Sequence, residues 1–103
     1  MSAPPIPQQS GDLEFEEFVR RVDATVRDAA TVGAFAPPAN SRPGSQARWE
    51  TRARNATVVL VPPRNVSVTL GGESGTPETT WYPVDAALVS VVSRRIAGYL
   101  GEA

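Results

Sequence analysis

The side chains that could do chemistry in this chain are carboxylates, hydroxyls and guanidinium groups. The 103 residues include eleven Asp and Glu and ten basic residues, all of which are arginine, and they include no histidine and no cysteine. Without histidine the usual general base near neutral pH is missing. Without cysteine and lysine there is no thiolate nucleophile, Schiff base or P-loop lysine. The sequence therefore lacks the side chains that most familiar catalytic mechanisms require.

Six of the eleven carboxylates lie between Asp12 and Asp28, on a predicted helix whose opposite face is apolar. A catalytic pair among them would have to be desolvated to shift a pKa, so we interpret this cluster as a solvated helix face. An enzyme would need a buried carboxylate that lines a pocket, and the candidates are Glu50, Glu73 and Asp85. We predict that the protein is not an enzyme and has no catalytic residues.

The sequence contains no pattern that indicates a cofactor or a metal. A metal site would have oxygen ligands alone, and the acidic residues do not follow the spacing of an EF-hand loop. The run Gly71–Gly72–Glu73–Ser74–Gly75 follows a predicted strand, but no Gly-Lys-Ser/Thr comes after it and no helix begins directly. This favours a flexible loop over a phosphate cradle. We therefore predict no cofactor and no metal.

The segment from residue 42 to residue 64 is basic, with five arginines against one glutamate. Alternation over residues 47–53 predicts a strand with Trp49 on one face and arginines on the other, and a short helix is the competing interpretation. One hypothesis is a basic patch that contacts nucleic acid, formed by Arg48, Arg52, Arg54 and Arg64. We favour the other, in which this strand faces the acidic helix of the same or a neighbouring subunit, because the net charge is only −1.

The predicted order of one helix, three strands and one helix resembles that of a double-stranded RNA-binding domain. In that family the second helix starts with a lysine-rich cluster that binds phosphate groups. The matching position here reads Pro83–Val84–Asp85. The resemblance therefore lies in the order of elements alone, and nucleic acid stays the less favoured partner.

The chain is predicted to be an extended Pro-rich arm over residues 1–11 and a single α+β domain over residues 12–103. Apolar residues spaced three and four apart predict a helix from Asp12 to about Thr31. A long loop with several Pro and Gly residues follows over residues 32–46, and a loop of this length indicates a function or an attachment to a partner. Strands are predicted at residues 47–53, 57–61 and 66–70, with a short edge strand at 79–82, before a C-terminal helix that starts near Pro83 and Asp85. The predicted fold class is an N-terminal helix, a three- to four-stranded antiparallel sheet and a C-terminal helix.

The C-terminal helix is unusually apolar. Residues 86–92 read Ala, Ala, Leu, Val, Ser, Val, Val, which is a wider apolar arc than one side of a small sheet needs. Either the helix lies between the sheet and the first helix, or its spare face meets another chain. Aromatic residues just before it are of the kind that anchor interfaces. The interface hypothesis comprises Trp81, Tyr82, Leu88, Val92 and Ile96.

These features lead to an expected function in assembly. We expect a small structural subunit that acts through protein–protein contacts, as a homo-oligomer or within a larger assembly. The arginine-only composition is typical of a GC-rich coding sequence, as in an actinobacterium or one of its phages, and a virion component of the tail or the head–tail joint would suit it. No stretch approaches the roughly 18–20 apolar residues that span a bilayer, and residues 1–11 lack the features of a secretory signal. We expect a location in the cytoplasm or the virion and no membrane partner.

Overall fold

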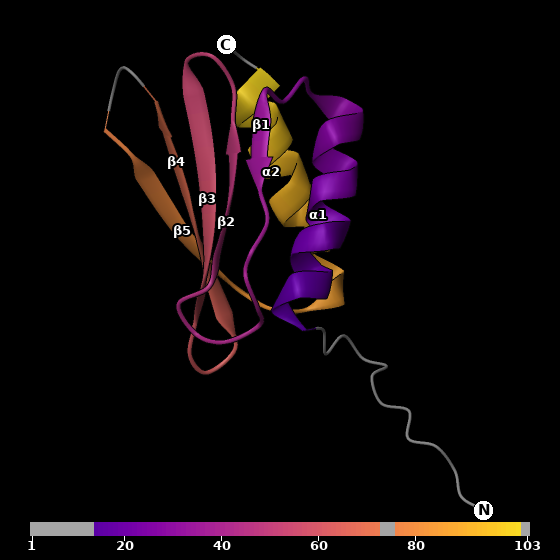
Figure 1. Cartoon of the computed structure of the whole chain (residues 1–103), viewed down its shortest axis with the longest axis vertical. Helices are drawn as coiled ribbons and strands as arrows, with labels where there is room; N and C mark the ends of the chain where they lie inside the picture. Colours follow the sequence, from indigo (N-terminus) through magenta and orange to yellow (C-terminus); the bar gives the residue numbers. More distant parts are fainter. Residues whose placement is uncertain (1–13, 73–75, 102–103) are drawn as a thin grey trace, which may run out of the picture.

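The described part of the chain folds into a helix, five strands and a second helix (Figure 1). The computed structural model describes residues 14–72 and 76–101, so the predicted arm over residues 1–11 lies outside the described residues. The elements in chain order are α1 (Phe15–Ala29), β1 (Ala34–Ala36), β2 (Gln46–Glu50), β3 (Arg54–Val61), β4 (Asn65–Gly72), β5 (Glu78–Pro83), the short 3₁₀ helix η2 (Ala86–Leu88) and α2 (Val89–Gly101).

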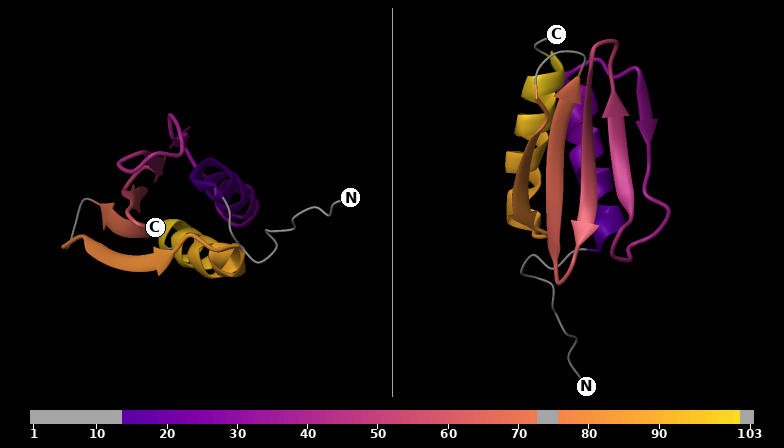
Figure 2. Two further views of the ribbon diagram at one scale, coloured as in Figure 1. Left: turned by 90° about the horizontal axis from the view of Figure 1, so that it is seen from below. Right: turned by 90° about the vertical axis from the view of Figure 1, so that its left-hand side faces the viewer.

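The strands form one antiparallel sheet in the order β1-β2-β3-β4-β5, so each strand pairs with its neighbour in the chain. The predicted α+β class, with a helix at each end of the chain, is confirmed, although the sheet has five strands rather than three or four. The additional strand is β1, which lies inside the segment predicted as the 32–46 loop and pairs with β2. Both helices lie against the same face of a curved sheet (Figure 2).

The core lies between the helices and this covered face. On α1 the residues Phe15, Phe18, Val19, Val22 and Val26 recur at spacings of three and four and are all buried, which places one apolar stripe against the sheet. The two helices also pack against each other. The sheet contributes every second residue of β2, β3 and β4, since successive side chains of a strand point to opposite faces. Its buried apolar members are Ala47, Trp49, Ala56, Val58, Val66, Val68 and Leu70.

Two hydrogen bonds tie α1 to other parts of the chain, one to β2 and one to the segment between β1 and β2. The Trp49 indole N–H donates to Asp23 Oδ1 at 2.8 Å, which ties α1 to β2. Ser41 Oγ accepts from the Glu16 backbone N–H at 3.0 Å, so a residue distant in the chain caps the first turn of the helix. Glu14 stands at the N-cap position and makes no side-chain cap itself. The segment after β1 is therefore held by the body of the fold.

Two expected boundaries differ from the structure. The strand predicted over residues 47–53 ends at Glu50, because Thr51 turns the chain and its backbone N–H bonds to the Arg54 carbonyl at 2.8 Å. Pro83 ends β5 instead of starting a helix, and Asp85 caps η2 by accepting from the Ala87 N–H. In the described part of the chain, β3 has one face without a helix over it, because both helices lie on the other face.

Neither α1 nor α2 is long and apolar enough to cross a membrane, as far as the described ranges show.

Candidate protein interaction surface

The second face of the sheet has no helix over it in the described part of the chain (Figure 2). We call this surface the open face. Strand register places its residues, because directly opposed residues of neighbouring strands share a face. From β2 to β5 it comprises Gln46, Arg48, Glu50, Asn55, Thr57, Val59, Val61, Asn65, Ser67, Thr69, Gly71, Thr79, Trp81 and Pro83.

The open face is uncharged over β3, β4 and β5. One row across it runs Thr57, Thr69, Thr79, and the hydroxyls of Thr69 and Thr79 lie 3.0 Å apart. The charges of the face are confined to β2, where Arg48 Nε lies 2.7 Å from Glu50 Oε2, so the two side chains neutralise each other. This leaves a surface of hydroxyl, amide and apolar groups, which would dock a partner without a strong charge of either sign.

Trp81 stands on this face at the edge strand. Its row continues inward through Ser67 and Val59. Trp81 is 60% exposed, whereas the chain's other tryptophan, Trp49, is fully buried, with its ring tilted against that of Phe35 and the two ring centroids 5.1 Å apart. A large exposed aromatic side chain on an uncharged surface is the usual anchor of a protein interface.

The structure separates the members of the predicted interface. Trp81 is exposed, and Tyr82 and Leu88 are half-buried, with Tyr82 packed against the core. Val92 and Ile96 have no exposed surface, because α2 packs against the sheet and against the neighbouring helix α1. These two residues are therefore removed from the predicted contact surface, and the wide apolar arc of α2 is explained by packing inside the chain. On α2 the exposed large apolar side chain is Val91, at 40%.

The four arginines of the predicted basic patch do not share one surface. Arg48 lies on the open face, and Arg52 lies in the turn before β3. Arg54 points to the covered side, where its Nη1 donates to the Tyr99 carbonyl at 2.8 Å and its guanidinium lies 4.8 Å from the centre of the Tyr99 ring. Arg64 lies in the turn at the other end of β3, roughly 25 Å from Arg54 at about 3.3 Å per residue.

The acidic helix and the arginine on β2 do not meet within the chain, since the sheet separates α1 from the open face. Two acids of α1, Glu17 and Asp23, pair with arginines of the same helix instead, as in Arg27 Nε to Asp23 Oδ1 at 2.9 Å. Glu17 accepts hydrogen bonds from Arg20 and Arg21, and these two guanidinium groups lower the pKa of its carboxyl below the ordinary value of 4.5. Part of the acidic charge of α1 is thus neutralised by arginines of the same helix.

Two of the three carboxylates that were candidates for catalysis have structural partners in the described residues. Glu50 is bound to Arg48 on the open face, and Asp85 is occupied as a helix cap. Glu73 lies outside the described residues. Within the described residues no group of three or more acids is arranged to hold a metal ion.

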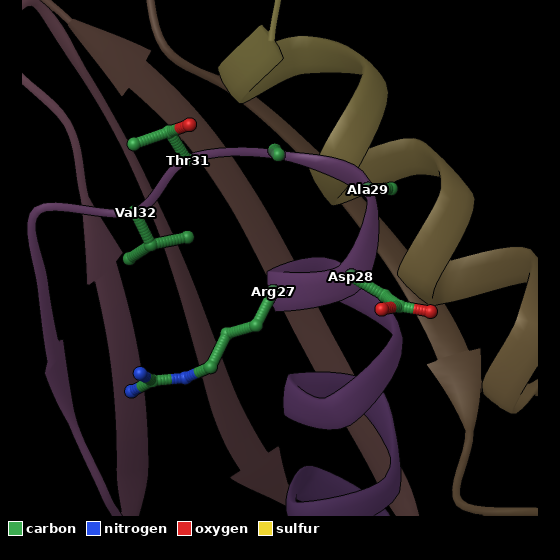
Figure 3. A pocket seen from close by; sticks show the side chains of 6 residues that line it. Arg27, Asp28, Ala29, Thr31 and Val32 are labelled. Carbon is green, nitrogen blue, oxygen red and sulfur yellow. The ribbon is translucent and has the colours of Figure 1, made fainter.

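The surface also has hollows, and the one in Figure 3 has a volume of about 390 Å³ at the C-terminal end of α1. Residues 27–32 line it. Arg27 and Asp28 point away from each other in this view, and the Arg27 guanidinium is already bound to Asp23 and lies 5.3 Å from the centre of the Phe35 ring. The lining groups do not converge on a common point, as a small-molecule site requires.

Comparison with protein-family models, with curated proteins and with solved structures finds no match to this chain.

The sequence pattern missed one part of this surface. It identified Trp81 as an anchor but assigned it to the same contact as the apolar helix. Alternation along residues 78–83 could have shown that Trp81 and Tyr82 lie on opposite faces of a strand. The two residues do so in the structure, where Tyr82 packs against the core and Trp81 does not.

Proposed function

We propose that the protein is a non-enzymatic assembly subunit that acts through protein–protein contacts at its open face, as a homo-oligomer or within a larger assembly. The observation that carries this proposal is the 60% exposure of Trp81 on an uncharged sheet face. Charged groups would favour a solvated surface, and the open face has none over three of its strands.

The energy that such a contact can supply is appreciable. A tryptophan buries about 150–250 Å² when it is covered, so the exposed part of Trp81 corresponds to roughly 100–150 Å². At about 25 cal/mol per Å² this is worth roughly 3 kcal/mol when a partner covers it. A contribution of this size is that of an interface hot spot.

A virion component of the tail or the head–tail joint remains the setting that we propose. The small size of the chain and its arginine-only, histidine-free composition support it. The cytoplasm or the virion is the corresponding location. A subunit of this kind needs surfaces that meet neighbours and needs no catalytic group.

The two exposed large apolar side chains provide a matched test. In light scattering at increasing protein concentration, the wild type should have a mass above that of one chain. Trp81→Arg should shift the protein toward the mass of one chain, because a charge at this position must be desolvated in the contact. Val91→Arg, on α2, should associate as the wild type does. Loss of association in Val91→Arg alone would assign the contact to α2 and contradict the proposal, as would a wild type that is monomeric at every concentration and binds no partner.

A further inference from the structure

The outer edge of β5 has a defined pattern of backbone groups. Among the described residues no strand lies beyond β5. The Val84 N–H donates to the Arg64 carbonyl on the β4 side at 2.9 Å. Because backbone groups of successive residues point to opposite sides of a strand, those of Tyr82 and Thr80 also point toward β4, and those of Trp81 and Thr79 point outward. The outer edge therefore presents the N–H and C=O groups of Thr79 and Trp81.

A proline lies at each end of this edge. Pro77 and Pro83 occupy the next outward positions in the same alternation, and proline has no N–H to donate. The two prolines lie at equal distances from Thr80, as do Thr79 and Trp81. The edge is thus symmetric about Thr80, and it offers N–H and C=O groups that a strand of the same sequence, running antiparallel, can satisfy.

The other edge of the sheet, formed by β1, does not present a comparable row of unpaired backbone groups. Strand β1 has only three residues, and Pro37 and Pro38 follow it directly. Short strands and prolines protect sheet edges from pairing with other chains. Residues 79–82 of β5 carry neither charge nor proline and have the Thr and aromatic residues that favour strands. Pairing of β5 with β1 of another copy would form an open chain of subunits, whereas pairing of β5 with β5 closes on itself.

We propose that the partner of this edge is a second copy of the same chain, and that two β5 strands pair antiparallel with Thr80 on the two-fold axis. This inference rests on the proposed function and names its partner. Thr79 of one copy then lies opposite Trp81 of the second copy, and each N–H meets a C=O. A shift that places Trp81 on the axis would set the Thr79 carbonyl opposite Pro83, which has no N–H to give.

The side chains are compatible with this register. On the open face, Trp81 lies beside Thr79 of the second copy, a pairing of an aromatic with a β-branched residue. Glu78 is bound to Arg95 of its own chain at 3.2 Å, and it lies opposite Tyr82 of the second copy rather than opposite a like charge. Helix α2 packs over β3 and β4, so the two α2 helices are about 19 Å apart, four strand spacings of about 4.8 Å, which exceeds the 8–10 Å of packed helices.

A proline at one outward position tests the backbone pairing. Thr79→Pro removes an outward N–H. It leaves the hydrogen bonds to β4 in place, because the neighbouring residues of β5 make those bonds. Thr79→Ala is the matched control, since it removes the same hydroxyl but keeps the N–H. We expect Thr79→Pro to raise the dimer dissociation constant at least tenfold and Thr79→Ala to change it less than threefold. Both should keep the wild-type circular dichroism spectrum.

A cysteine at the axis tests the register independently, and the chain contains no other cysteine. Opposed residues of a non-hydrogen-bonded antiparallel pair have Cα atoms about 4.5 Å apart, within reach of a disulfide. Under air or oxidised glutathione, two Thr80→Cys thiols should be oxidised to one intermolecular disulfide, whereas Thr69→Cys, on the inner strand β4, should stay a free thiol.

The outcomes separate this inference from the proposed function. A wild-type oligomer that Thr79→Pro weakens and Thr80→Cys crosslinks supports both. An oligomer that is unaffected by Thr79→Pro and does not crosslink through Thr80→Cys overturns the β5 pairing and leaves the proposed function standing. A wild type that is monomeric at every concentration, and in which Thr80→Cys does not crosslink, overturns the pairing; the proposed function falls with it only if no partner protein co-purifies.

Discussion

The bond between Asp23 and Trp49 should be one of the strongest single polar contributions to the stability of this fold. The Trp49 side chain is fully buried, and its indole N–H donates to the Asp23 carboxylate at 2.8 Å. Asp23→Ala leaves this donor buried without an acceptor, which costs about 1–3 kcal/mol. It also removes the ion pair with Arg27, worth about 0.3–0.5 kcal/mol. We expect a loss of about 2–3 kcal/mol in the free energy of unfolding, and about 4–8 °C in Tm for each kcal/mol.

Urea denaturation followed by circular dichroism measures this loss, and a double-mutant cycle with Trp49→Phe assigns it. Phenylalanine cannot donate a hydrogen bond, so Asp23→Ala in the Trp49→Phe background should cost only the exposed ion pair, below about 0.5 kcal/mol. Asp23→Asn keeps an acceptor oxygen and should cost less than Asp23→Ala. An equal cost of Asp23→Ala in both backgrounds would refute the role assigned to this hydrogen bond.

Three further substitutions test individual contacts by urea denaturation. Arg54→Ala should lower the free energy of unfolding by about 2 kcal/mol, because the hydrogen bond to the Tyr99 carbonyl and the ring contact are lost. A change near zero would show that these two contacts do not stabilise the fold. Ser41→Ala should cost about 1 kcal/mol because the Glu16 N–H loses its cap; stability equal to the wild type would contradict this. Glu17 has a lowered pKa in the folded chain, so its contribution is present above pH 4.5 and is lost as the pH falls through the folded pKa. Glu17→Gln should therefore lose less stability than the wild type when the pH is lowered through this range, and parallel pH profiles would contradict that expectation.

The helices and the inner strands could be predicted from the sequence because their patterns reflect one buried face. The apolar spacing from Phe15 to Val26 has the period of a helix, and the alternation in β2 and β4 has the period of a strand. Strand β1 could not be predicted in this way. Its three residues lie between glycine and proline, and they are held by pairing with β2 and by the contact of Phe35 with Trp49, which are distant in the chain.

The predicted sites depended on contacts that a sequence pattern does not contain. Continuing the alternation of residues 47–53 placed Arg54 on the same face as Arg48, but the turn at Thr51 resets the alternation, so Arg54 points to α2. The apolar arc of α2 was equally consistent with an internal and an external contact. Packing of α1 beside α2 decided this for Val92 and Ile96, which are buried inside the chain.

Sedimentation equilibrium of the wild-type chain over a wide range of concentrations tests the central claim most directly. If the open face and the β5 edge bind a second copy, the average mass rises with concentration and levels off at twice the mass of one chain, since the pairing of two β5 strands is closed. A mass that stays at one chain throughout would contradict self-association through this surface, and a mass that continues to rise beyond two chains would contradict the closed pairing.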